Sequence, residues 1–177
     1  AILAANLDRH VPGDRQVLFT RCRAWIINQG YSSEINALCL KKFTCVAGSG
    51  RAKWSFRIPV GTGRSVDIDI RLALHRDENR VTLSILRQGR GSEQELLDDE
   101  DPVQLILRPD IESRSFHAKT KAFAGPEREW SGCVQQRAGG FVFRPNAAPG
   151  LFMQISNGAF VSEPEWVYMV PHPDDAQ

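Results

Sequence analysis

Two acidic side chains, Asp67 and Asp69, have a spacing that sugar-bond hydrolysis could use. They alternate with apolar residues over 64–74, which is typical of a half-buried antiparallel strand. On a strand both would project from one face with Cα atoms about 6.5 to 7 Å apart, and a glycosidase needs two carboxyl groups about 5 to 9.5 Å apart. Such residues are also common as solvent-facing charges. The pair therefore stands as an alternative hypothesis that requires one carboxyl group with a raised pKa.

Aromatic residues late in the chain offer a different chemistry. Trp130, Trp166 and Tyr168 lie among polar residues rather than inside apolar runs. Their rings could stack on the apolar faces of sugar rings while Glu165 or Arg128 bonds to hydroxyl groups. The same rings could instead pack in the core or against a neighbouring domain.

Other catalytic and cofactor sites find no support in the sequence. There is no Gly-x-Ser-x-Gly elbow, and 61–64 lacks the lysine and helix of a phosphate loop. The four histidines are dispersed and the cysteines lack zinc-site spacing. The acidic run at 93–101 lacks the glycine turn and spacing of a calcium loop. We expect no catalytic residue in the chain itself, no metal and no cofactor.

The composition of the chain limits the classes of binding partner and the cellular compartment that we expect. The 177 residues carry 22 Lys and Arg against 21 Asp and Glu, a balance that argues against a nucleic-acid partner and favours a neutral one. No apolar run is long enough for a membrane span. Four cysteines without a signal peptide are interpreted as free, buried thiols of a cytoplasmic protein. The chain begins at Ala1 without methionine, so we expect a fragment of a larger protein.

Hydrophobic periodicity predicts a mainly β protein with one or two short helices. A helix is expected over 15–29, with Asp14 as N-cap and Gly30 after its C-terminus; the β-formers in this stretch make a strand the alternative. Period-two patterns predict strands over 35–46, 52–60, 64–74, 80–87, 103–107, 140–144, 150–156 and 166–170. Residues 64–74 and 80–87 should pair as a hairpin. The pattern indicates one antiparallel β-sandwich domain over 1–177, with a mobile acidic loop at about 88–102.

Two segments resemble a known family. Residues 107–117, LRPDIESRSFH, and 166–175, WVYMVPHPDD, are similar to the N-terminal domain of bacterial and archaeal glycogen debranching enzymes of the amylo-α-1,6-glucosidase type. The resemblance covers about residues 103–177. Arg114, His117 and Trp166 match positions that recur in that accessory domain.

The resemblance implies a galactose-mutarotase-like supersandwich that leads into a separate (α/α)6 catalytic domain of the same polypeptide. It implies a non-catalytic accessory domain that braces the catalytic domain and contacts an α-glucan or oligosaccharide. A free-standing carbohydrate-binding module is one alternative, and a glycosidase using Asp67 and Asp69 is another. The expected sites of carbohydrate or interdomain contact are Arg114, His117, Trp130, Glu165, Trp166 and Tyr168.

Overall fold

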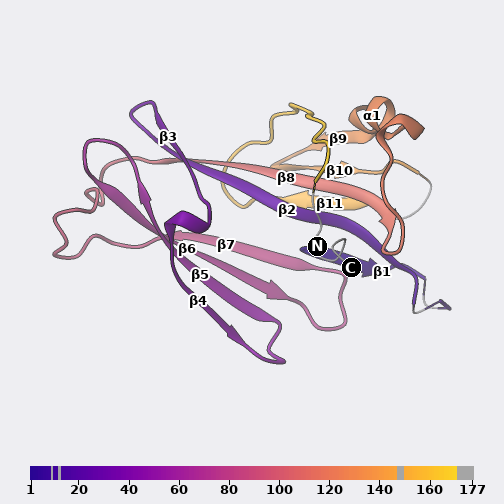
Figure 1. The fold of residues 1–177 in the computed structure, drawn as a ribbon, viewed down its shortest axis with the longest axis horizontal. Coiled ribbons are helices and arrows are strands. Elements are labelled where there is room, and N and C mark those ends of the chain that lie inside the picture. Colours follow the sequence, from indigo (N-terminus) through magenta and orange to yellow (C-terminus); the bar gives the residue numbers. More distant parts are fainter. Residues whose placement is uncertain (9, 12, 147–149, 171–177) are drawn as a thin grey trace. The chain divides into compact units, whose positions relative to one another are not determined.

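A computed structural model describes residues 1–8, 10–11, 13–146 and 150–170. The chain divides into two compact units, an N-terminal unit, Ala1–Glu112, and a C-terminal unit, Ser113–Gln177. Antiparallel strands dominate both units (Figure 1). The mainly β, antiparallel prediction is therefore confirmed.

The first sheet of the N-terminal unit is built on one long strand. That strand, β2, pairs with β1 and β3 in antiparallel fashion and also with β8. The bounds of these strands are β1 Leu3–Asn6, β2 Arg15–Asn28, β3 Tyr31–Glu34 and β8 Gln104–Ser115. Figure 1 shows β2 and β8 running side by side.

The helix expected over 15–29 is wrong, because this stretch is β2. Its β-branched and aromatic residues pack better on a pleated surface than on a helix. Gly30 does adopt the left-handed conformation expected of it, with φ +83°, but so does Gln29, with φ +48°. Two successive positive φ values are typical of a two-residue hairpin turn, and here that turn joins β2 to β3. The left-handed residue marked a hairpin rather than a helix end.

The second sheet of the N-terminal unit is a four-stranded meander in the order β4-β5-β6-β7. Its strands are β4 Leu40–Val46, β5 Arg51–Pro59, β6 Ser65–Leu74 and β7 Val81–Arg87. The predicted pairing of residues 64–74 with 80–87 is confirmed as the β6–β7 hairpin. One part of the expected 35–46 strand is instead a short 3₁₀-helix, Ala37–Cys39.

The two sheets share an apolar core, as a sandwich requires. Ile26 of β2 joins Phe56, Ile58, Val66 and Ile68 of the second sheet in one buried cluster. The even-numbered residues of β6 face this core, as their alternation predicts, so the odd-numbered ones face outward.

The C-terminal unit contains a smaller sheet and the single α-helix of the described residues. The sheet has the order β11-β10-β9, with bounds β9 Val134–Arg137, β10 Gly140–Phe143 and β11 Leu151–Gln154. Helix α1, Pro126–Glu129, stands between 3₁₀-helices at Ala122–Ala124 and Trp130–Cys133.

Two further expectations are corrected. Residues 166–170 form no strand; Met169 has φ +53°, which interrupts an extended backbone. The four cysteines are free thiols, but none is buried and Cys45 is exposed.

Candidate functional site

The C-terminal unit gathers four aromatic side chains into a row, which we call the aromatic row: Phe143, Trp130, Trp166 and Tyr168. Trp130 packs edge-on against Phe143 at a ring-centroid distance of 5.3 Å. Trp166 follows at 5.7 Å from Trp130, and Tyr168 at 6.5 Å from Trp166. Phe143 is completely buried and Tyr168 is exposed, so the row leads from the core of the unit to its surface.

Local structure fixes both ends of this row. Phe143 is the last residue of β10, and Trp130 follows α1 directly. Helix α1 begins at Pro126, a residue suited to the first helical position because its φ is already helical. The hydroxyl of Tyr168 donates a hydrogen bond to Glu127 of the same helix. This bond raises the pKa of Tyr168, because the acceptor favours the protonated phenol.

The rings in the row are tilted rather than coplanar. The planes of Trp130 and Trp166 make an angle of 55°, and those of Trp166 and Tyr168 make 61°. These angles are typical of aromatic packing inside proteins. They leave no common flat surface on which consecutive sugar rings could stack.

Exposed apolar side chains occur in the same segment as the outer end of the row. Tyr168 is 59% exposed, Met169 is 94% exposed and Val161 is also exposed. Exposed apolar side chains gathered in one segment are typical of contact surfaces. Met169 additionally holds a left-handed backbone, which is unusual for a residue other than glycine or asparagine.

The structure brings together three of the expected site residues, Trp130, Trp166 and Tyr168. Glu165 is exposed and directly precedes Trp166. Arg114 donates to the backbone carbonyls of Ser115, Phe116 and Ala118, the shortest bond being 2.7 Å to Ala118. These bonds give Arg114 a part in holding the turn after β8.

The remaining expected residue, His117, lies on that same turn. Its ring packs edge-on against Phe116 with 5.4 Å between ring centroids. Sequence reasoning missed the contribution of Phe143 and Glu127 to the aromatic row. The apolar alternation of β10 could have indicated Phe143, whereas nothing in the sequence pairs Glu127 with Tyr168.

The carboxyl groups of Asp67 and Asp69 project from the outer face of β6, and cations hold both. Arg57 donates to Asp67 through two nitrogens, at 2.8 and 2.9 Å. These hydrogen bonds hold the pKa of Asp67 below its usual range despite partial burial. Burial acts to raise the pKa of Asp69, but the ammonium of Lys53 at 2.7 Å and the Ser55 hydroxyl outweigh it, and the pKa is lowered. The raised pKa that a catalytic acid needs is found at neither residue.

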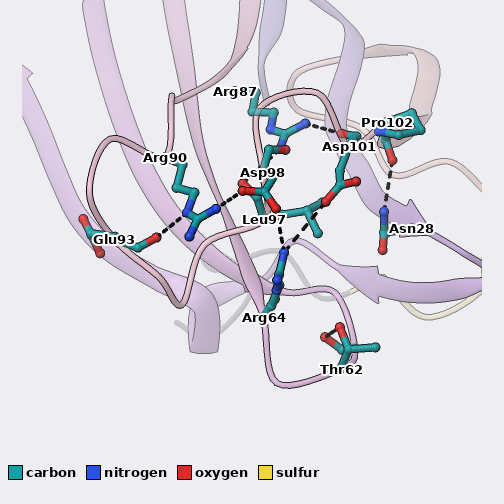
Figure 2. Close-up of polar contacts among 11 residues, drawn as sticks. Asn28, Thr62, Arg64, Arg87, Arg90, Glu93, Leu97, Asp98, Asp101 and Pro102 are labelled. Carbon is teal, nitrogen blue, oxygen red and sulfur yellow. Dashed lines mark hydrogen bonds and ion pairs between the residues drawn. The ribbon is translucent and has the colours of Figure 1, made fainter.

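The acidic segment, residues 88–102, is held by arginines (Figure 2). Asp98 pairs with Arg64 at 3.0 Å and with Arg90. Arg87 donates to the backbone carbonyls of Asp98 and Asp101, both at 2.6 Å, and of Leu97 at 3.3 Å. The Asp98 carboxylate, one of the oxygen ligands that a calcium ion in this segment could use, is therefore engaged with two arginines. No group of metal-ligand residues is found in the part of the chain that the structure describes.

Apolar and backbone contacts also fix this segment. Leu96 and Leu97 are buried, and Leu97 joins the core between the sheets. Its amide donates to the carbonyl of Ser65 at 2.8 Å. The side chain of Asn28 donates to the carbonyl of Pro102 at 3.0 Å, which anchors the far end of the segment. The mobility expected of residues 88–102 stays a prediction.

None of the helices in residues 1–8, 10–11, 13–146 and 150–170 has the length and apolar character to cross a membrane.

Comparisons with known proteins identify the family. The family model described as glycogen debranching enzyme N terminal matches residues 1–177, the whole chain, including the part before residue 103 that the sequence resemblance did not cover. No curated protein and no solved structure matches it. The chain belongs to the family of glycogen debranching enzyme N-terminal domains.

Proposed function

We propose that residues 1–177 act as one accessory domain of an α-glucan debranching enzyme, a glycoside hydrolase, and brace a catalytic domain of the same polypeptide. Family membership supports the presence of such a partner domain. The observation that carries the proposal is the exposure of Tyr168 and Met169 at the outer end of the aromatic row. Met169 exposes 94% of its surface, and a partner that covers it would remove that apolar surface from water.

The aromatic row gives this surface a rigid foundation. Trp166 contacts both Trp130 and Tyr168, and Trp130 reaches the fully buried Phe143. A surface anchored in this way loses little conformational entropy when a partner binds. The tilt between the rings suits packing against another domain better than stacking on a glucan chain.

The test uses the full-length debranching enzyme with Met169→Glu. A charge placed in a dry interface is costly, so the half-life of activity at an inactivating temperature should shorten at least several-fold. Leu38→Glu is the matched control, because Leu38 is 95% exposed and lies in the N-terminal unit. Equal half-lives for the two variants would rule out bracing through Met169.

A second candidate function is contact with the glucan chain. Trp130 and Trp166 are both only partly buried, so each ring could contact a single sugar, and exposed Glu165 directly precedes Trp166. Calorimetric titration with maltoheptaose should then show binding that Trp166→Ala weakens. If no heat of binding is detected at millimolar maltoheptaose at either of two temperatures, glucan contact is ruled out as a function of these residues.

We also propose a cytoplasmic location. Four free thiols in a chain of 177 residues support a reducing compartment. Alkylation of intact cells, followed by mass spectrometry of the protein, should find all four cysteines reduced. A disulfide in the cellular protein would contradict the location.

A further inference from the structure

The outer face of the β4-β5-β6-β7 sheet carries a shallow groove with a volume of about 370 Å³. Strand register explains its composition. Thr44, Lys53, Arg71 and Ser84 lie opposite one another across the four strands, and the next row toward the β4–β5 turn is Val46, Arg51, Ala73 and Thr82. All eight line the groove. The groove is therefore two neighbouring rows of the sheet, seen from the side opposite the core.

Positive charge is concentrated in these two rows. Arg51, Lys53 and Arg71 are the charged members, and neither row contains a carboxylate. Asp69 is the acidic residue of the adjoining row, where it lies opposite Ser55. It is 4% exposed and is paired with Lys53 at 2.7 Å. Asp69 can thus neutralise one of the three cations, which leaves an excess of positive charge in the groove.

Two guanidinium groups keep most of their hydrogen-bonding capacity. Among the described residues, the Arg71 side chain forms one ion pair, with Asp69 at 3.9 Å, which is beyond hydrogen-bond distance. Within the described residues the backbone amide of Arg51 donates to the Ser49 hydroxyl, and its side chain makes no hydrogen bond or ion pair. Each guanidinium can donate several hydrogen bonds in a planar fork that matches phosphate oxygens.

Hydroxyl groups complete the chemistry of the groove. Thr44 and Ser84 flank Lys53 and Arg71, while Thr82 lies across Ala73 from Arg51. The Thr82 hydroxyl is held by a ring nitrogen of His75 at 2.8 Å. The small side chain of Ala73 opens space between Arg51 and Thr82. Cations with hydroxyls around an open floor fit a ligand that carries both an anionic group and hydroxyl groups.

We propose that this groove binds a phosphate monoester of a sugar, with the phosphate between Arg51 and Arg71 and the sugar hydroxyls facing Thr44, Thr82 and Ser84. Charge complementarity carries the assignment. Three cationic side chains line the groove, and the buried Asp69 in the adjoining row is the carboxylate that partly balances their charge. The site lies in the N-terminal unit and is independent of the function proposed for the aromatic row.

The experiment is a titration of the whole chain with glucose 6-phosphate at low ionic strength. Binding is monitored through the NMR chemical shifts of the backbone amides. Glucose and inorganic phosphate serve as the two reference ligands. We expect shifts in the two rows of the groove, binding at least tenfold tighter than for glucose and several-fold tighter than for inorganic phosphate. Binding should weaken strongly between 0.01 M and 1 M salt, because screening shortens the Debye length from about 30 Å to about 3 Å.

Variants separate the groove from general charge attraction. Arg51→Gln removes a side chain with no partner among the described residues and should weaken glucose 6-phosphate binding at least tenfold. Arg15→Gln is the matched control, because Arg15 is exposed on β2 in the other sheet of the same unit and its loss changes net charge equally.

Three results would overturn the proposal. The first is that Arg51→Gln binds as tightly as the unaltered chain or is affected no more than Arg15→Gln. The second is that glucose binds as well as glucose 6-phosphate, since the charge would then contribute nothing. The third is that inorganic phosphate binds as tightly as glucose 6-phosphate, since the hydroxyls would then play no part.

Discussion

Arg87 should stabilise the acidic segment more than any single ion pair around it. Its guanidinium donates to the backbone carbonyls of Asp98 and Asp101 at 2.6 Å and of Leu97 at 3.3 Å. Arg87→Met keeps an apolar stem and removes these donors. Hydrogen bonds to a charged group contribute about 1.5 kcal/mol each at the lower end of their range. The two short bonds therefore contribute about 3 kcal/mol.

One atom of Arg87 acts in the opposite direction. Its Nε is buried and has no hydrogen-bond partner among the described residues, and such an atom costs about 1 kcal/mol. Arg87→Met also removes this unfavourable contribution. The net loss of stabilising free energy in the variant should therefore be about 2 kcal/mol.

Amide hydrogen exchange at Leu97 measures this loss directly, because that amide donates to Ser65 at 2.8 Å and is released when the segment opens. A loss of about 2 kcal/mol should speed its exchange about 30-fold. Arg64→Met is the matched control. Arg64 reaches the same segment through an ion pair with Asp98 at 3.0 Å and a longer one with Asp101 at 3.9 Å. The side chains are 40–41% exposed, and exposed pairs of this kind contribute between nothing and about 1 kcal/mol. A change of less than twofold in Arg87→Met, or equal changes in both variants, would refute the reasoning.

Two further predictions concern titratable groups. Asp67 has a lowered pKa because Arg57 binds its charged form, so the stabilisation is present above the unfolded pKa of about 3.9 and is lost as pH falls through the folded value. Asp67→Asn should therefore lower the free energy of unfolding at pH 7 and flatten its decline below about pH 4 in urea titrations; an unchanged acid profile would contradict this. Partial burial and the nearby charge of Asp110 raise the pKa of Cys22 to about 11, so iodoacetamide at pH 8 should label exposed Cys45 at least tenfold faster than Cys22. Equal labelling rates, read by mass spectrometry, would show that Cys22 is not shielded.

Period-two patterns predicted most of the strands because the two faces of each strand meet different surroundings. In β6, Val66 and Ile68 enter the core while Asp67 faces outward, and the sequence alternation carries that difference. The 15–29 stretch failed because both faces of β2 bear buried residues, as at Leu18 and Phe19, and the alternation is lost. Asp14 and Gly30, interpreted as helix ends, then favoured the helix prediction. In the structure, Gly30 lies instead in the hairpin turn after β2.

The candidate site was only partly predictable. Trp130, Trp166 and Tyr168 were expected as functional aromatics, and the structure places them in contact. Their convergence could not be predicted, because contacts between residues 36 positions apart depend on how the chain returns on itself. The groove on the β4-β5-β6-β7 sheet went unnoticed for a related reason. Arg51 and Arg71 become neighbours only through the register of β5 and β6.

Oxidation of Met169 tests the proposed bracing role most directly. The chain has two methionines, and the partly buried Met153 of β11 provides an internal reference. The full-length debranching enzyme would be treated briefly with hydrogen peroxide, native and then denatured, and each site would be quantified by mass spectrometry. The bracing role predicts that Met169 oxidises at least tenfold more slowly in the native enzyme than in the denatured one. Because Met169 is 94% exposed in the chain itself, equal rates in native and denatured enzyme would show that no partner domain covers it and would contradict the account.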